Sequence, residues 1–335
     1  MEIILLIPIF LGFVISLFSI PFWIRKAKKF GLVGKDVNKV DKEDVAEAGG
    51  ICVVIGFIIG VLSYVAIKTF YFKTNENLIE IFVLLSTILM VCFIGFIDGI
   101  LGWKIGLNRK TRILFLFFAS IPLIVINAGE ARMMGIELGL LFPLVIIPLG
   151  IIGASATFNF LAGYNGLETG QGIIILSSLS IITFIMGNTW LSIITLCMVS
   201  SLISFYVFNK YPAKVFPGDV LTYSVGALIA VIAILGNVEK IAVFFFIPYI
   251  IETGLKIRGK LKKESFAKVN EDGSLEMPYG KIYGLEHLAI YILKKIKPNK
   301  KVYEREVVYL INGFQILIIV AGFLIFKEGI FANAG

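Results

Sequence analysis

The sequence has few of the residues that build histidine-dependent or cysteine-dependent sites. It holds one histidine, His287, and three cysteines among 335 residues. A single histidine excludes a histidine triad and a metal centre with several histidine ligands. Cys52, Cys92 and Cys197 stand far apart and show no zinc-binding spacing. All three fall inside apolar runs, where cysteine usually acts as a small buried hydrophobic residue.

Charge is also scarce. Charged residues make up 16% of the chain and hydrophobic residues 58%, whereas a soluble domain has about 25% and about 45–50%. The excess collects in runs of roughly 17–22 residues, long enough to cross a bilayer core of about 30 Å. We therefore expect an all-α, polytopic membrane protein, with one domain over residues 1–335 and about ten transmembrane helices. The expected spans are residues 3–24, 49–67, 78–97, 111–128, 139–158, 172–187, 189–208, 220–236, 240–256 and 306–326.

The basic residues predict which side each loop faces. The net charge is +8, and 26 of the 31 Lys and Arg residues lie in or next to the loops after odd-numbered spans. Loops rich in Lys and Arg remain on the cytosolic side, so we expect both termini on the opposite side. Topology thus accounts for the positive charge, and no nucleic-acid partner is expected. The cytosolic loops expected to build the site are residues 25–48, 98–110, 159–171, 209–219 and 257–305.

One loop is especially informative: Asn159-Phe-Leu-Ala-Gly-Tyr-Asn-Gly-Leu-Glu-Thr-Gly-Gln171. Glycine lets the backbone approach a ligand closely, and asparagine offers both donors and acceptors, as the edge of uracil requires. Gly and Asn also dominate ordinary turns. Composition alone therefore leaves a connecting turn as an equal alternative.

Two carboxylates stand at the ends of apolar runs. Asp219 closes the segment Tyr211-Pro-Ala-Lys-Val-Phe-Pro-Gly-Asp219; it could bind Mg²⁺ or cap the next helix. Asp98 ends another run, and a carboxylate there is costly unless it faces a polar cavity. The basic residues beyond Asp98, which include Lys110 and Arg112, either anchor the chain to anionic lipid or hold phosphate.

Together these segments resemble the polyprenyl-phosphate N-acetylhexosamine-1-phosphate transferases, and most of all the eukaryotic and archaeal UDP-GlcNAc:dolichyl-phosphate GlcNAc-1-phosphate transferases. Residues 159–171 are similar to the family's Asn-x-Leu-Ala-Gly-x-Asn-Gly-Leu-Glu-x-Gly-Gln, and residues 211–219 to its Tyr-Pro-x-x-Val-Phe-x-Gly-Asp. Shorter matches occur at residues 234–236 and 273–277. The resemblance covers nearly the whole chain in order.

The resemblance implies transfer of N-acetylglucosamine-1-phosphate, or a related HexNAc-1-phosphate, from a UDP-sugar to dolichyl or polyprenyl phosphate. UMP would leave, and the product would begin a lipid-linked glycan for N-glycosylation. The implied cofactor is Mg²⁺, with Mn²⁺ as an alternative. The implied partners are UDP-N-acetylhexosamine, the lipid phosphate and membrane lipid, and a homodimer is left open. The enzyme would lie in the plasma membrane of a prokaryote or the ER membrane of a eukaryote, with a cytosolic active site.

The resemblance also assigns roles by position. It implies metal binding by Asn159 and Asp219, nucleotide binding by Gly163, Asn165, Phe216 and Glu47, catalysis by Asp98, Arg112 and Lys110, and a site loop role for Asp36, Asn38, Lys39, Glu168 and Lys268. A phosphate has a second pKa of about 6 and is largely dianionic at neutral pH. A general base is therefore not obligatory, although Asp98 is the candidate.

The sequence departs from the family pattern at two places. Gly99 stands where the family usually has a second, adjacent aspartate. The family's basic motif, His-Arg-x-Pro-Arg/Lys, aligns with residues 264–268 and leaves only Lys268. Arg258, Lys262 and Lys263 are the candidate replacements. The sequence therefore supports the reaction type better than the identity of the sugar.

Two alternatives remain. A secondary transporter would also have about ten spans, but its site would lie near the bilayer midplane, often between repeated halves. Here the polar residues gather at one face, and no repeat stands out. A bacterial-type transferase would use undecaprenyl phosphate with a UDP-muramyl peptide or UDP-GlcNAc. The segments at 211–216 and 275–277 favour the dolichyl branch.

Overall fold

A computed structural model describes residues 2–133 and 136–331. The helices are α1 (Leu6–Lys29), α2 (Gly50–Ala66), α3 (Leu78–Ile105), α4 (Arg109–Val125), α5 (Ile147–Phe158), α6 (Leu167–Ile185), α7 (Thr189–Asn209), α8 (Gly218–Leu235), α9 (Glu239–Phe245), α10 (Ile247–Arg258), α11 (Leu285–Ile296), α12 (Glu304–Ile325) and α13 (Lys327–Phe331). A 3-10 turn, η1 (Ile3–Leu5), precedes α1, and π-helical turns η2 (Ile67–Tyr71) and η3 (Phe142–Ile146) adjoin α2 and α5. Three antiparallel hairpins pair β1 (Val33–Lys35) with β2 (Asp44–Ala46), β3 (Arg132–Met133) with β4 (Ile136–Glu137), and β5 (Lys268–Val269) with β6 (Leu275–Glu276).

The prediction of an all-α, polytopic membrane protein is confirmed. Helices occupy most of each of the ten expected spans. Within the described residues, seven helical segments are long and apolar enough to cross a membrane. These are Ile3–Lys29, Gly50–Tyr71, Leu78–Leu101, Leu167–Ile185, Thr189–Asn209, Gly218–Leu235 and Glu304–Ile325.

The expected count of ten spans is not confirmed. Helix α4 and the helix Phe142–Phe158 each have only 17 residues. The ninth expected span is broken at Phe246 into α9 and α10. Pro248 stands in the first turn of α10, and proline has no backbone N–H with which to continue a preceding helix.

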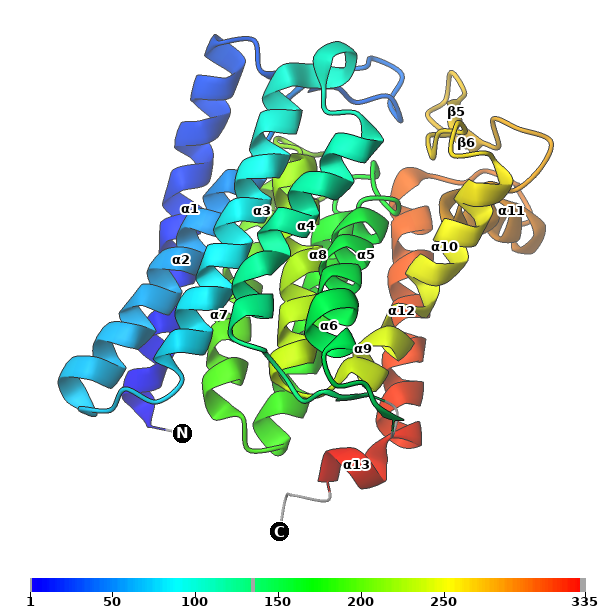
Figure 1. The fold of residues 1–335 in the computed structure, drawn as a ribbon. Coiled ribbons are helices and arrows are strands. Elements are labelled where there is room, and N and C mark those ends of the chain that lie inside the picture. Colours follow the sequence, from blue (N-terminus) through cyan, green and yellow to red (C-terminus); the bar gives the residue numbers. More distant parts are fainter. Residues whose placement is uncertain (1, 134–135, 332–335) are drawn as a thin grey trace.

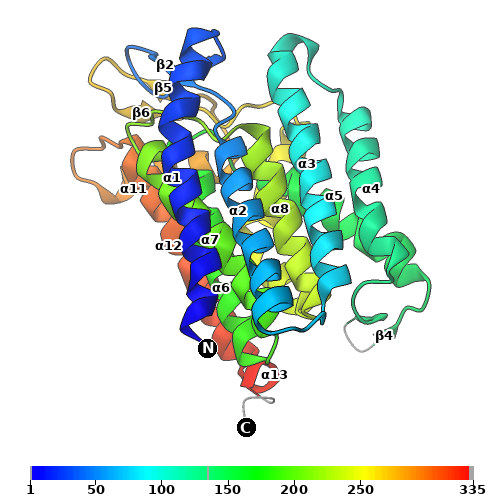
Figure 2. The same cartoon turned by 90° about the vertical axis from the view of Figure 1, so that its left-hand side faces the viewer.

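The long helices lie side by side, and both termini are at one end of the bundle (Figure 1). The hairpins β1–β2 and β5–β6 and the turn between α3 and α4 lie at the other end (Figures 1 and 2). Helix α1 packs on α2 and α7, while α8 packs on both α3 and α5. The loops after odd-numbered spans therefore share the end opposite the termini, as the basic residues predict.

Helix α8 forms the centre of the bundle. Every residue from Val220 to Ile234 is buried. Its first turn lies directly against α3, because a Cβ atom on Gly95 would come within 2.7 Å of the backbone of Asp219. Glycine permits such close packing between membrane helices. This contact places Asp219 beside the part of α3 that carries Asp98.

Candidate active site

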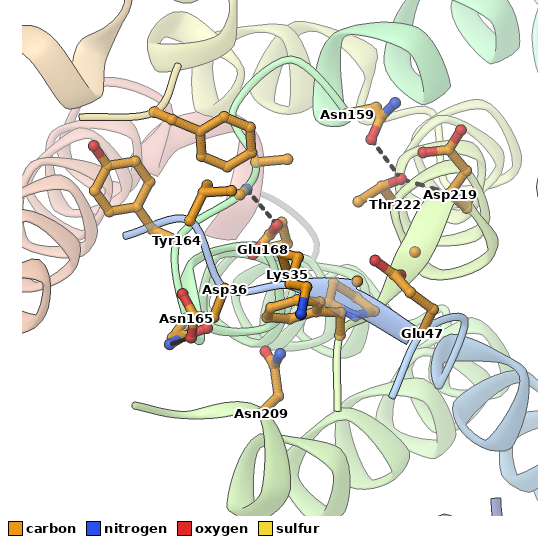
Figure 3. A pocket seen from close by; sticks show the side chains of 18 residues that line it. Lys35, Asp36, Glu47, Asn159, Tyr164, Asn165, Glu168, Asn209, Asp219 and Thr222 are labelled. Carbon is orange, nitrogen blue, oxygen red and sulfur yellow. Dashed lines mark hydrogen bonds between the residues drawn. The ribbon is translucent and has the colours of Figure 1, made fainter. Parts of the chain in front are cut away.

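A cavity of about 320 Å³, here called the polar pocket, opens among the loops at the end opposite the termini (Figure 3). Its walls come from the β1–β2 hairpin, the loop at 159–166, the first turns of α6 and α8, and Phe266. Eight of the residues that the sequence assigns to the site line this pocket: Asp36, Glu47, Asn159, Gly163, Asn165, Glu168, Phe216 and Asp219. The structure therefore gathers these residues from three distant loops around one space, and Phe266 adds a fourth loop.

Backbone pairing joins the first loop to the segment before α8. The amide of Phe216 donates to the carbonyl of Ala46 at 2.7 Å, and the amide of Gly49 donates to the carbonyl of Phe216 at 2.9 Å. This short ladder places Phe216 and Glu47 along one wall of the pocket. Burial raises the pKa of Glu47 above its ordinary value.

The loop at 159–166 presents its backbone to the polar pocket. Gly163 has a φ of +104°, and a Cβ atom there would come within 2.8 Å of the Phe266 ring. The amide of Gly163 donates to Glu168 Oε1 at 2.7 Å, and Asn38 Nδ2 donates to the carbonyl of Gly163 at 3.2 Å. Glycine is therefore required at 163 by both conformation and space. This geometry is more specific than that of an ordinary connecting turn.

Asn165 is held by two carboxylates. Its Nδ2 donates to Asp36 Oδ2 at 2.9 Å and to Glu304 Oε2 at 3.4 Å, and its backbone amide donates to Glu304 Oε1 at 2.8 Å. Lys39 Nζ lies 2.8 Å from Asp36 Oδ2 and completes the network without lining the pocket. The side-chain donor of Asn165 is thus engaged within the protein, and no hydrogen bond from the described residues reaches its Oδ1.

Asp219 lies between an amide and a second carboxylate. The side chains of Asn159 and Asp98 both lie close to the Asp219 carboxylate. Asn159 Oδ1 accepts a hydrogen bond from the Thr222 hydroxyl at 3.0 Å (Figure 3). Pro217, rather than Asp219, occupies the N-cap position of α8. The alternative of an N-capping aspartate therefore does not describe this residue, although its charge still suits a helix N-terminus.

The sequence places Asp98 at the end of a span, and this boundary is wrong. Helix α3 continues to Ile105, so Asp98 lies within it, and its side chain is buried. Asp98 Oδ2 lies 2.7 Å from Arg112 Nε, and Asp98 Oδ1 accepts the amide of Leu107 at 2.8 Å. Arg112 also donates to the Tyr223 hydroxyl at 3.3 Å. Asp98 lines neither pocket described here, but its partner Arg112 lines one of them.

A second cavity of about 410 Å³, here called the cationic pocket, adjoins the first. The two cavities share the lining residues Asn159, Ala162 and Phe266. Four cations line the cationic pocket: Arg109, Arg112, Lys256 and Lys263. One wall is apolar and is formed by Ile113, Leu116, Ala156 and Phe160. The arrangement suits a ligand with an anionic head and an apolar tail.

Five predicted site residues line neither pocket; Asn38, Lys39 and Asp98 bond to residues that do, whereas Lys110 and Lys268 are exposed. Lys110 is exposed and does not line either one, because it stands two positions before Arg112 and projects from another side of α4. Lys268 is exposed in β5 and likewise lines neither. Of the three candidate replacements for the family's basic motif, only Lys263 lines a pocket.

The oxygen donors near Asp219 fit a metal that a ligand would help to hold. Within residues 2–133 and 136–331, no group of three or more His, Cys, Asp or Glu side chains could bind a metal ion. Mg²⁺ bound with phosphates typically takes only one or two protein carboxylates. The Asp219 carboxylate meets that requirement, and the Asn159 amide oxygen supplies a second oxygen donor. Asp98 lies close to Asp219.

Several lining residues are not predicted from the sequence. Tyr164 is buried inside the loop at 159–171, and Thr222 follows Asp219 by three residues. The motif at 159–171 could have suggested Tyr164, and the motif at 211–219 could have suggested Thr222. Phe266 and Lys256 carried no such signal. Phe266 lies in the segment that departs from the family pattern, and Lys256 reads as one more charge at the end of an apolar run.

The fold and site define a polytopic helical membrane protein whose polar and cationic pockets meet at one end of the bundle. Residues 81–237 match the family described as glycosyl transferase family 4. The chain is 39% identical over 278 residues, 81% of its length, to a Saccharolobus solfataricus protein provisionally named UDP-N-acetylglucosamine–dolichyl-phosphate N-acetylglucosaminephosphotransferase, and covers 83% of that protein. The chain belongs to this glycosyltransferase family.

Two further relatives carry two different enzyme names. A Dictyostelium discoideum UDP-N-acetylglucosamine–dolichyl-phosphate N-acetylglucosaminephosphotransferase is 30% identical over 66% of this chain and 63% of the relative. A Streptococcus thermophilus phospho-N-acetylmuramoyl-pentapeptide-transferase is 29% identical over 72% of this chain and 75% of the relative.

Proposed function

We propose that this protein transfers N-acetylglucosamine-1-phosphate from UDP-N-acetylglucosamine to dolichyl or polyprenyl phosphate and releases UMP. The product would be the first intermediate of a lipid-linked glycan for N-glycosylation. The observation that carries this proposal is the junction of the two pockets at Asn159, Ala162 and Phe266. Two different ligands bound there would meet end to end. The names of the archaeal and Dictyostelium relatives support the same donor and acceptor.

The polar pocket is suited to the UDP-sugar. The backbone at Gly163 and the free Oδ1 of Asn165 would face uracil, and the Phe216 ring offers an apolar surface for the base. The carboxylate of Asp219 lies at the side of this pocket nearest the cationic pocket, beside Asn159. The diphosphate of the donor would therefore lie at the junction.

The cationic pocket is suited to the lipid phosphate. Arg112 and Lys263 would offset the charge of the phosphate, and Arg109 adds a third cation at the same wall. The apolar residues Ile113 and Phe160 would contact the first isoprene units of the tail. The bilayer would take the rest of the lipid.

In the proposed reaction, an oxygen of the lipid phosphate attacks the β-phosphorus of the donor, and the bond to the UMP oxygen breaks. Such transfers depend mainly on positioning and on neutralisation of charge. Arg112, held by Asp98, would orient the attacking phosphate. Asn159 and Asp219 would hold Mg²⁺, or Mn²⁺ in its place, and the bound ion would neutralise charge on the diphosphate.

We also propose that the site faces the cytosol, since the basic loops surround it. The membrane would be the plasma membrane of a prokaryote or the ER membrane of a eukaryote. A homodimer is the assembly we would test first. The second candidate function is that of a bacterial-type transferase that uses undecaprenyl phosphate. The name of the streptococcal relative supports it.

The test is incubation of the purified protein with UDP-N-acetylglucosamine, dolichyl phosphate and Mg²⁺, followed by analysis of UMP and the lipid product. Parallel reactions would contain undecaprenyl phosphate, or a UDP-muramyl peptide as donor. UMP release only with the muramyl peptide would favour the bacterial-type activity. Movement of intact UDP-sugar into proteoliposomes without UMP release would instead indicate a transporter.

A further inference from the structure

Four ionisable side chains are buried together beneath the loop at 261–267. Glu252 and Lys256 lie one turn apart on α10, and Glu286 and His287 stand in the first turn of α11. Glu252, Glu286 and His287 have no exposed surface, and Lys256 is 9% exposed. Burial of charge is costly unless the groups are paired. We call these four residues the α10–α11 cluster; the reaction proposed above assigns no role to any of them.

The cluster joins the two helices. Glu252 Oε2 accepts the amide of Leu285 at 2.6 Å, at the N-terminus of α11. A Cβ atom on Gly284 would come within 2.6 Å of Glu286 Oε2 and 3.1 Å of Glu252 Oε1, so glycine lets both carboxylates approach this point. Burial and the neighbouring Glu252 raise the pKa of Glu286 well above its ordinary value. Lys256 Nζ lies 3.5 Å from Glu252 Oε1, so these two side chains form an ion pair within the cluster.

The same cluster holds the backbone of the overlying loop. Lys256 Nζ donates to the Ser265 hydroxyl. From the other side, the Tyr164 hydroxyl donates to the carbonyl of Ser265 at 3.4 Å. These contacts come from two separate parts of the chain and fix the position of Ser265.

Phe266, the next residue, stands at the boundary between the two pockets. Its side chain lines both, and its ring contacts Gly163, where no Cβ atom would fit. Ala267 donates its amide to Asn38 Oδ1 at 3.3 Å, and Asn38 also binds the carbonyl of Gly163. A shift of Ser265 would therefore move the wall that separates the two ligands.

We propose that Lys256, set in place by Glu252, is a positioning residue that holds Ser265 and thereby fixes Phe266 at the boundary between the pockets. In this way the α10–α11 cluster would align the donor with the acceptor, an inference that rests on the proposed function. Lys256 also lines the cationic pocket. Direct contact with the lipid phosphate is therefore the competing role that the experiment must separate.

The first test needs no substrate. In the full-length protein in detergent, Lys256→Met and Ser265→Ala are each expected to speed amide hydrogen exchange at residues 264–267, and the amide of Ala267 should report it most directly. Lys262→Met is the matched control, since Lys262 is exposed and lines neither pocket. Unchanged exchange in Ser265→Ala and in folded Lys256→Met would overturn the proposal, whether or not the wild type is a transferase. If Lys256→Met does not fold, Ser265→Ala decides alone.

The second test separates positioning from phosphate binding. A misplacement of about 1 Å costs on the order of 10²-fold in rate, so Lys256→Met should lower kcat by about that factor while both KM values stay nearly constant. Lys256→Met combined with Phe266→Ala should be no slower than Phe266→Ala alone, because coupled residues are not additive. A raised KM for lipid phosphate with additive losses would assign Lys256 to phosphate contact and refute positioning. Absence of wild-type UMP release would instead refute the proposed function and leave the exchange result standing.

Discussion

Asp98 Oδ2 lies 2.7 Å from Arg112 Nε, so a carboxylate within α3 fixes a guanidinium that lines the cationic pocket. The Asp98 side chain is 1% exposed and that of Arg112 is 34% exposed. The pair therefore joins a buried carboxylate to a partly exposed guanidinium group. This relationship favours an orienting role for Asp98 over proton abstraction from the substrate, because Asp98 lines neither pocket.

The first prediction follows from that pair. Asp98→Asn is expected to lower turnover substantially, because the neutral amide holds Arg112 less firmly, while UDP-sugar binding is retained. An orienting role predicts a loss that does not depend on pH. A loss of about 10²–10⁴-fold, largest at low pH where the lipid phosphate is protonated, would instead indicate a general base. The pH profile of kcat distinguishes the two, and wild-type turnover throughout would remove Asp98 from the mechanism.

The second prediction concerns metal. Activity is expected to vanish with a chelator and to return with Mg²⁺ or Mn²⁺, since oxygen ligands suit hard cations. Asp219→Asn should abolish turnover while the protein still inserts and folds. UMP release and the melting temperature in detergent measure the two effects. If Asp219→Asn keeps full activity, Asp219 has only a structural role at the start of α8.

The third prediction concerns the nucleotide. Asn165→Ala should weaken binding of UDP and of the UDP-sugar to a similar extent, because both contain uracil. Glu304→Gln should produce a smaller loss, since Glu304 orients Asn165 without lining the pocket. Isothermal titration with UDP measures both. An unchanged affinity for UDP in Asn165→Ala would place uracil elsewhere.

The fourth prediction concerns stability and pH. The pKa of Glu47 is raised by burial in the folded protein, so the unfolded chain ionises first as pH rises. Wild type should therefore lose stability relative to Glu47→Gln once the pH passes the ordinary glutamate pKa, and the difference should level off above the raised pKa. Melting temperatures of the two ligand-free proteins from pH 4 to pH 8 provide the comparison. A constant difference across this range would contradict the burial effect.

The fifth prediction concerns topology. A reporter inserted in the 257–305 loop should be cytosolic, and a reporter at the C-terminus should lie on the other side. The reason is the excess of Lys and Arg in the loops at the end opposite the termini. Accessibility of both reporters in intact cells measures this. A cytosolic C-terminus would place the site on the side of the membrane away from the cytosolic UDP-sugar and would contradict the prediction.

The helical membrane fold follows from the sequence alone. Apolar runs of spanning length have few stable alternatives in a bilayer, because every backbone polar group must be paired within the segment. Residues in the motifs at 159–171 and 211–219 form most of the lining of the polar pocket, and the family resemblance, rather than composition, assigned them to a site. The break at Phe246 is less evident from hydropathy, which reads α9 and α10 as one span.

Tertiary structure alone decided which charges enter the site. Lys110 and Arg112 look equivalent in sequence, but only Arg112 meets Asp98 and Tyr223. Among the basic residues near the degenerate motif, Lys263 lines the cationic pocket and Lys268 does not. These differences arise from contacts between residues that are far apart in sequence. The packing of α4 on α3 and of α11 on α10 determines which Lys and Arg side chains reach a pocket. The sequence therefore determined the kind of site, and packing between distant helices selected the residues that complete it.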